Sequence, residues 1–302
     1  MTAAISLPLR IGARTIWRID RRLVPVSISL DDGLRGAPPV LPSLPREAEG
    51  YLIRALPAAL LGLLMAARPD LRPFVRQRYQ RSYASLEGDF DAYLASFSSK
   101  SRSTLKRKLR KLTERSGGML DIRDCRAPED VDAFHRDARA VSTKSYQERL
   151  LAAGLPDGEE TRTEMRDRAA RDAMRGWLLF VDGAPISYLY APAEGDTLIY
   201  AHLGYDPAFS EFSPGTVLQL EAMRDLMEEG RFRLFDFTEG DGQHKRQFGT
   251  GALECVDLLL LRPTLPNLLI GHALRAFDGA VALAKAVAAR TGLERLARSL
   301  LR

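Results

Sequence analysis

A short run of residues, Ser213-Pro214-Gly215-Thr216, has the composition of an anion-binding helix start. Serine is common at the N-cap of a helix, and proline is common at the first helical position. The first turn of a helix presents unpaired N–H groups and the positive end of the helix dipole, which attract phosphate or carboxylate. Gly215 would let the backbone approach a ligand closely. The same residues also fit a well-capped helix that binds nothing.

Titratable side chains lie on either side of this helix start. His202 has a side-chain type whose pKa suits a general base. Asp236 and Glu239 follow the next predicted strand, at an edge where carboxylates often face a ligand. His244 could protonate a leaving group, and Lys245 could hold phosphate or acceptor charge. Structural alternatives stay open for three of these residues. His202 also fits a core histidine, Asp236 fits a carboxylate that bonds to backbone N–H groups, and Lys245 fits an exposed helix face.

The elements that would position these residues follow a defined order. Hydrophobic periodicity predicts, between residues 119 and 261, a strand, two helices, three antiparallel strands, a helix, a strand, a short helix and a strand. Earlier in the chain, residues 15–30 and 74–86 read as strands, and residues 47–65 read as a helix interrupted by Pro57. The pattern indicates an α+β protein.

A strongly basic helix is predicted between Ser98 and Arg115. It carries eight lysines and arginines from Lys100 onward, opposed only by Glu114. We consider three interpretations: contact with tRNA or another polyanion, contact with an anionic sugar or lipid headgroup, and a solvated face. No aromatic residue interrupts the basic run, which weakens the case for single-stranded nucleic acid.

Two blocks of sequence resemble the GNAT superfamily, in particular the bacterial acetyltransferases related to the FemABX peptidyltransferases, some of which act in exopolysaccharide pathways. The blocks are GYDPAFSEFSPGTVLQLEAMRDLMEEG (204–230) and FDFTEGDGQHKRQFG (235–249). The segments SSKSRSTLKRKLRKL (98–112) and VSTKSYQERLLAAGL (141–155) are similar as well. The resemblance covers roughly residues 78–261.

The resemblance implies a GNAT fold, with a mixed, mostly antiparallel sheet flanked by helices. It implies a tandem of a degenerate N-terminal GNAT-like half that includes the basic helix, a complete C-terminal GNAT half, and C-terminal amphipathic helices. The expected boundaries are 1–117, 118–262 and 263–302.

The implied activity is transfer of an acyl group from acetyl-CoA or another acyl-CoA to an amino-sugar, a sugar nucleotide or a cell-envelope polysaccharide precursor. The implied general base and acids are His202, Asp236, Glu239 and His244. Residues implied in donor binding are Leu203, Gly204, Tyr205, Ser213, Pro214, Gly215, Thr216 and Lys245, and residues implied near the acceptor are Lys144, Tyr146 and Gln147.

Two departures from the family pattern keep alternatives open. The Gly-rich phosphate loop of ordinary GNAT enzymes is replaced by Ser213-Pro214-Gly215-Thr216, and His244 stands where relatives commonly carry tyrosine. An aminoacyl-tRNA-dependent transferase is one alternative, motivated by the basic helix. A non-catalytic, nucleotide-binding GNAT module is another.

Composition bounds the remaining possibilities. The chain has 302 residues, a net charge of +5 and two distant cysteines, Cys125 and Cys255. No Cys/His spacing fits a zinc site, so no metal is expected. The most apolar stretch, residues 55–67, is too short to span a bilayer. We expect a cytoplasmic protein, with peripheral attachment at the inner membrane face and a homodimer left open.

Overall fold

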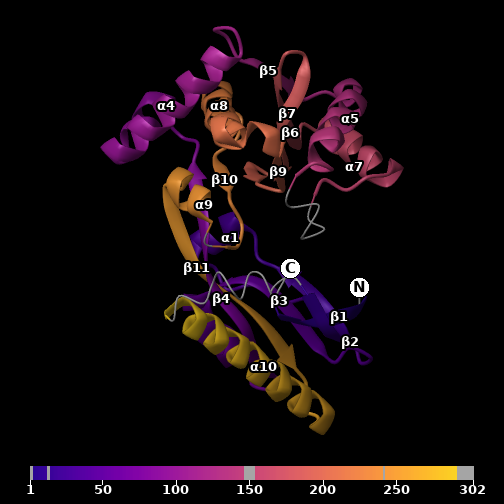
Figure 1. Ribbon diagram of the computed structural model, residues 1–302. Coiled ribbons are helices and arrows are strands. Elements are labelled where there is room, and N and C mark those ends of the chain that lie inside the picture. The colour runs from indigo at the N-terminus through magenta and orange to yellow at the C-terminus, as the bar shows by residue number, and fades with distance from the viewer. Residues whose placement is uncertain (1–2, 12–13, 146–153, 241, 291–302) are drawn as a thin grey trace. The chain divides into compact units, whose positions relative to one another are not determined.

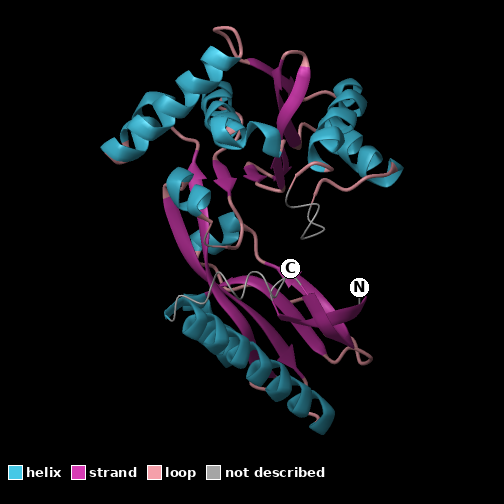
Figure 2. Ribbon diagram, in the orientation of Figure 1, coloured by secondary structure: helices cyan, strands magenta, loops and turns pink. Residues whose placement is uncertain are grey.

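The structure, a computed structural model, combines β-sheet with covering helices (Figures 1 and 2), as the predicted α+β class requires. Over the described part of the chain, no helix has both the length and the apolar character that crossing a membrane needs. The described residues are 3–11, 14–145, 154–240 and 242–290.

The chain forms two compact units. One unit consists of residues 82–252, and the other combines residues 1–81 with residues 253–302. The unit boundaries fall within two strands, β4 (Arg72–Ser85) and β11 (Gly251–Leu261).

The unit of residues 82–252 is built on a mixed sheet. The strand order is β4–β10–β8–β7–β6–β5, and β9 pairs with β7 outside this path. Adjacent strands run antiparallel, except that β8 and β10 are parallel. Its strands are β5 (Asp121–Cys125), β6 (Met174–Val181), β7 (Ala184–Glu194), β8 (Thr197–Ile199), β9 (His202–Tyr205) and β10 (Leu234–Asp236). Its helices are α3 (Phe90–Ala95), α4 (Ser99–Arg115), η2 (Pro128–Asp130), α5 (Val131–Ser142), α7 (Glu159–Ala170), η3 (Pro207–Phe212), α8 (Pro214–Glu229) and α9 (Gln243–Phe248).

Helices cover both faces of this sheet, and the side chains of β6 show the division. Leu178 and Phe180 pack in one cluster with Phe134 of α5 and with residues of α7. Trp177 and Leu179 pack in a second cluster with residues of α4 and α8. Every residue of β6 is buried, as expected of a strand covered on both faces. The helices α5 and α7 therefore line one face, and α4 and α8 line the other.

The basic helix α4 packs through its leucines onto the unit of residues 82–252. Leu105 and Leu112 are almost fully buried and share a cluster with Val217 and Leu220 of α8. The expected boundary at 117/118 placed this helix in the N-terminal half, and the structure differs from that expectation. A boundary chosen at a glycine pair follows local chain signals, whereas the leucine stripe decides which core the helix joins.

The other unit has the strand order β1–β2–β3–β11–β4. The helix α10 (Leu265–Arg290) packs on it through Leu274, which clusters with Phe74 and Leu259. The C-terminal helix thus belongs with the N-terminal residues and does not form the separate region expected from 263 onward. The remaining elements are β1 (Ala3–Ile11), β2 (Arg14–Ser27), α1 (Leu30–Arg35), β3 (Gly50–Pro57), η1 (Ala58–Leu60) and α2 (Leu61–Ala67).

The prediction of a helix over residues 47–65 is wrong for its first half. Residues Gly50–Pro57 form the strand β3, in which Tyr51 and Ile53 face one apolar cluster and Leu52 faces another. A strand buried on both faces has an unbroken apolar run, which periodicity alone does not distinguish from a buried helix.

The packing of α4 leads to a stability prediction. Replacing Leu112 with alanine should lower the free energy of unfolding of the 82–252 unit by about 2–5 kcal/mol, because a fully buried leucine leaves a cavity. The exposed Lys106→Ala is the control and should change it by less than about 0.5 kcal/mol. Denaturant unfolding followed by the fluorescence of the buried Trp177 measures both. An unchanged midpoint for Leu112→Ala would contradict this placement of α4.

Candidate functional site

The strands β9 and β10 of the 82–252 unit separate beside the start of α8. β8 pairs with β10 as far as Ile199 opposite Asp236, and the Tyr200 N–H still donates to the Asp236 carbonyl at 2.8 Å. Beyond that point the chain continues as β9, which pairs with β7. Within the described residues, β10 has no continuation alongside β9. The edge of β9 that faces away from β7 is therefore open.

An extra residue causes this parting. Ala193 of β7 lies opposite Leu198 of β8, whereas Tyr190 of β7 lies opposite His202 of β9, so the register shifts by one residue in between. The irregularity falls at Tyr200–Ala201. The register between β7 and β9 then runs evenly through Gly204.

The backbone of Leu203 is directed toward the open edge. The Asp206 N–H donates to the Ile186 carbonyl, and bonded and non-bonded pairs alternate along an antiparallel ladder. By this alternation Leu203 and Tyr205 occupy non-bonded positions opposite β7. Their N–H and C=O groups point away from β7, where a bound molecule could pair with them.

The start of α8 differs from the expectation in one respect. The helix begins at Pro214, as predicted, but Ser213 has a left-handed backbone (φ 54°, ψ 50°) and its hydroxyl makes no capping hydrogen bond. The N–H groups of Thr216 and Val217 both donate to the Ser213 carbonyl. Among the described residues, nothing accepts a hydrogen bond from the Gly215 N–H. An uncapped amide at a helix start is a donor for an anion.

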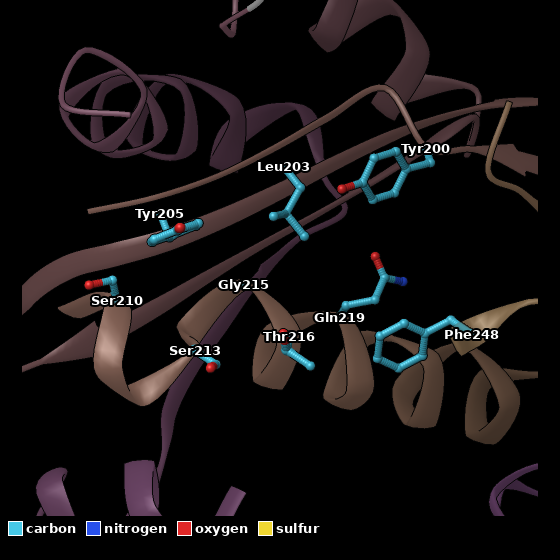
Figure 3. Close-up of a pocket in the computed structure, with 9 residues that line it drawn as sticks. All are labelled: Tyr200, Leu203, Tyr205, Ser210, Ser213, Gly215, Thr216, Gln219 and Phe248. Atoms are coloured by element: carbon cyan, nitrogen blue, oxygen red, sulfur yellow. The ribbon is translucent and has the colours of Figure 1, made fainter. Parts of the chain in front are cut away.

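A pocket of about 240 Å³ lies between the start of α8 and the open edge of β9 (Figure 3). The expected donor-binding residues Leu203, Tyr205, Ser213, Gly215 and Thr216 all line it. The other lining residues are Tyr200, Ser210, Gln219 and Phe248. A cleft therefore lies beside the start of α8, as an anion-binding helix start requires. The main-chain N–H groups of Leu203 and Gly215 lie beside it.

The inner end of the pocket is formed by Tyr200, Gln219 and Phe248. Burial raises the pKa of Tyr200 above its ordinary value, so its phenol stays protonated at neutral pH. Gln219 is 1% exposed, and neither its Nε2 nor its Oε1 has a hydrogen-bond partner among the described residues. A buried amide without partners is costly, and it marks this end of the pocket as polar and unsatisfied.

One lysine of the basic helix reaches the helix start. Lys108 Nζ lies 3.3 Å from Thr216 Oγ1, a pocket-lining atom. Burial and the neighbouring charge of Arg107 lower the pKa of Lys108. An anion bound at the start of α8 would oppose both effects by favouring the ammonium form. Lys108 thus connects the basic helix to the pocket.

His202 and Gly204 lie on the opposite face of β9 from the pocket. His202 lies over the ring of Tyr190, with the ring centroids 6.4 Å apart and the planes 13° from parallel. A Cβ on Gly204 would meet the ring of Tyr188 at 2.4 Å. Both tyrosines belong to the cluster under α5 and α7. The structure therefore places His202, the expected general base, and Gly204 on one face of β9, and Leu203 and Tyr205 on the other.

The predicted carboxylates do not line the pocket. Asp236 is buried at the end of β10, where its Oδ1 accepts a hydrogen bond from the Thr238 N–H at 2.8 Å. Glu239 is exposed, and its backbone carbonyl accepts a hydrogen bond from the Lys245 ammonium. Lys245 is buried, and its Nζ also contacts Thr238 Oγ1 at 3.4 Å. These three residues stabilise the turn that follows β10, a contact the sequence did not reveal.

The remaining predicted residues are only partly placed. His244 belongs to α9, and its side chain lies outside the described part of the structure, as do Tyr146 and Gln147. Lys144 Nζ pairs with Asp206 Oδ2 at 2.9 Å, at the end of β9. Over the described residues, no group of three or more His, Cys, Asp or Glu side chains is arranged to hold a metal ion.

Sequence reasoning missed Tyr200, Gln219, Phe248 and Lys108. Gln219 carried a usable signal, since it is a polar residue between Leu218 and Leu220, one and a half turns into the helix. Lys108 carried none, because one lysine among eight basic residues has nothing in the sequence to single it out.

Comparison with known proteins finds a matching family model and solved structures of similar fold. Residues 99–246 match the family model described as acetyltransferase (GNAT) domain. A solved structure of FemX is 12% identical, with a TM-score of 0.56, and covers 74% of this chain and 74% of its own. The C-terminal domain of a protein from Agrobacterium fabrum designated a lysylphosphatidylglycerol synthetase is 14% identical, with a TM-score of 0.51, and covers 78% and 73%. No curated protein matches the chain in sequence.

The contact between α8 and β9 can be tested with Gly215→Ala. The added Cβ would lie 2.9 Å from Leu203 Cδ2, so the leucine side chain must move into the pocket. If the pocket binds CoA, as the sequence resemblance implies, we expect the affinity for CoA, measured by calorimetry, to fall about tenfold, while stability changes by no more than about 1 kcal/mol because alanine favours the helix. The control is Gly62→Ala, whose Cβ meets nothing within 4 Å. Equal CoA affinity in the two variants would contradict the assigned pocket.

Proposed function

We propose that the protein is an acyl-CoA-dependent N- or O-acyltransferase, a proposal that the match of residues 99–246 to the acetyltransferase (GNAT) family model supports. Its donor is acetyl-CoA or another acyl-CoA. Its acceptor is an amino-sugar, a sugar nucleotide or a polysaccharide precursor of the cell envelope. The observation that supports the proposal most directly is the pocket in which an uncapped helix start meets an unpaired strand edge.

The two ends of this pocket suit the two ends of an acyl-CoA. The Gly215 N–H, with the hydroxyls of Ser213 and Thr216 and the nearby Lys108 ammonium, would hold the diphosphate. The Leu203 N–H, on the open edge of β9, would donate to the thioester carbonyl oxygen. That donor gains strength as the oxygen becomes negative in the transition state, which is the interaction that accelerates acyl transfer.

The reaction requires two proton movements. The acceptor amine or hydroxyl attacks the thioester carbon, a C–N or C–O bond forms, and the C–S bond breaks. The acceptor loses one proton and the thiolate gains one. In our proposal His202 takes the proton from the acceptor. The protonated Tyr200, which lines the donor pocket, stabilises the departing thiolate by a hydrogen bond, and the thiolate then takes its proton from solvent.

This scheme places donor and acceptor on opposite faces of β9. The donor lies on the α8 face, with Leu203 and Tyr205. The acceptor lies on the α5 face, with His202 and the Lys144–Asp206 pair. Because β9 has an open edge, a thioester held there can be reached from both faces. An acceptor with hydroxyl or charged groups would find partners in Lys144 and Asp206.

Acetyl-CoA binding and turnover test the proposal together. The intact protein should bind acetyl-CoA in calorimetry and should release free CoA when an amino-sugar such as glucosamine or a UDP-linked amino-sugar is supplied. His202→Gln should retain acetyl-CoA binding and lose about 100-fold or more in turnover. No acetyl-CoA binding at millimolar ligand would remove the proposal, and unchanged turnover in His202→Gln would remove the assigned base.

Lys108 provides a test of where the diphosphate lies. Lys108→Met should weaken acetyl-CoA binding about fivefold to tenfold and leave binding of acetyl-pantetheine, which lacks the diphosphate, unchanged. Lys106→Met, an exposed position on the same helix, is the control. If Lys108→Met and Lys106→Met weaken acetyl-CoA binding equally, the effect comes from the general field of α4 and the specific contact is refuted.

An aminoacyl-tRNA-dependent transferase is the second candidate, and one observation favours it. The outer face of α4 forms a shallow, basic hollow of about 560 Å³, lined by Ser99, Arg102, Ser103, Lys106, Arg107 and Arg110. Under this reading charged tRNA binds in a strongly salt-dependent manner and acetyl-CoA does not bind. The two candidates therefore give opposite results in the same calorimeter.

A further inference from the structure

Gln219 is a buried polar group that the proposed reaction does not use. It lies on α8, one and a half turns beyond the helix start, and lines the inner end of the donor pocket. Its exposed fraction is 1%, and both polar atoms of its side chain are without a partner among the described residues. Figure 3 shows its amide directed from α8 across the pocket toward the wall that carries Leu203 and Tyr200.

A buried amide of this kind needs a ligand of matching chemistry. Its Nε2 can donate and its Oε1 can accept, so a chain that carries both amide carbonyl and amide N–H groups can satisfy both atoms. Leaving both atoms desolvated and unpaired is unfavourable for the free protein, and a bound water or a bound molecule would relieve that cost. The surrounding walls, Leu203, Tyr200 and Phe248, suit the thin, partly apolar chain on which such an amide would lie.

We propose that Gln219 is a specificity-determining residue that pairs with an amide of the donor's pantetheine arm. The inference rests on the proposed function and adds to it. The diphosphate would be held at the helix start, and recognition of the donor would be completed 9 Å or so deeper, as set by the rise of six helical residues from Ser213 to Gln219. An aminoacyl ester of tRNA has no amide in its linkage, so Gln219 selects against it.

The decisive variant is Gln219→Met, which keeps the length and approximate volume of the side chain and removes both polar atoms. We expect acetyl-CoA and acetyl-pantetheine to bind about 10- to 100-fold more weakly, the equivalent of two ordinary hydrogen bonds. We also expect the Tm of the ligand-free variant to rise by about 2–4 °C, because an unsatisfied buried amide has been removed. A residue with only a structural role would not produce weaker binding together with higher stability.

The matched control is Gln80→Met, the same chemical change at an exposed position, which should alter neither quantity. A second arm uses two acetyl-CoA analogues, each with one pantetheine amide nitrogen replaced by a methylene. One analogue should bind the wild type about tenfold more weakly than acetyl-CoA, and that difference should vanish in Gln219→Met.

The outcomes separate the inference from the proposed function. If the wild type binds acetyl-CoA and Gln219→Met binds it equally well, the inference is wrong and the proposed function stands. If Gln219→Met loses both binding and stability, Gln219 is a packing residue and the inference is also wrong. If the wild type binds neither acetyl-CoA nor acetyl-pantetheine, both fail.

Discussion

The separation of β9 from β10 is the constraint on which the candidate site depends. A strand inside a sheet has all of its backbone groups paired, and it offers nothing to a ligand. The one-residue shift at Tyr200–Ala201 ends the pairing with β10 and leaves the Leu203 N–H on an open edge, while pairing with β7 keeps that edge rigid. The uncapped start of α8 then faces this edge, and the pocket is the space between them.

The alternation of side chains along β9 explains why the donor-binding residues and the proposed base lie on different faces. Side chains alternate along a strand, so Leu203 and Tyr205 line the pocket while His202 lies on the opposite face, stacked on Tyr190. Only the open edge itself is accessible from both faces. A two-substrate reaction suits this arrangement, because donor and acceptor can approach one bond from opposite directions without competing for space.

Much of the 82–252 unit could be predicted from its sequence. The hairpin at Asp182-Gly183, the helix start at Pro214 and its end at Gly230 are set by local chemistry, and the structure has all three. The strand β3 could not be distinguished from a helix, because its apolar run reflects burial on both faces. The association of α4 and α10 with their units depends on Leu112 and Leu274 finding distant partners, which no local pattern records.

The candidate site, too, could be predicted from the sequence only in part. The position of the helix start was predictable, since proline is common at the first position of a helix, and α8 begins at Pro214. The side chains were not. Ser213 was expected to cap α8, yet its left-handed backbone directs the hydroxyl elsewhere, and Lys245 was expected at the donor but bonds the turn after β10. Gln219 and Lys108 lie at the pocket only because α8 and α4 pack beside β9 and beside each other.

The most direct test of this account follows the backbone amides themselves. In protein labelled with ¹⁵N, titration with CoA should shift the Leu203 and Gly215 amide resonances together, saturating at the same ligand concentration. Those two N–H groups are the donors that the open edge and the uncapped helix start provide. If CoA binds while both resonances stay in place and the shifts appear elsewhere in the protein, the pocket between α8 and β9 is not the donor site.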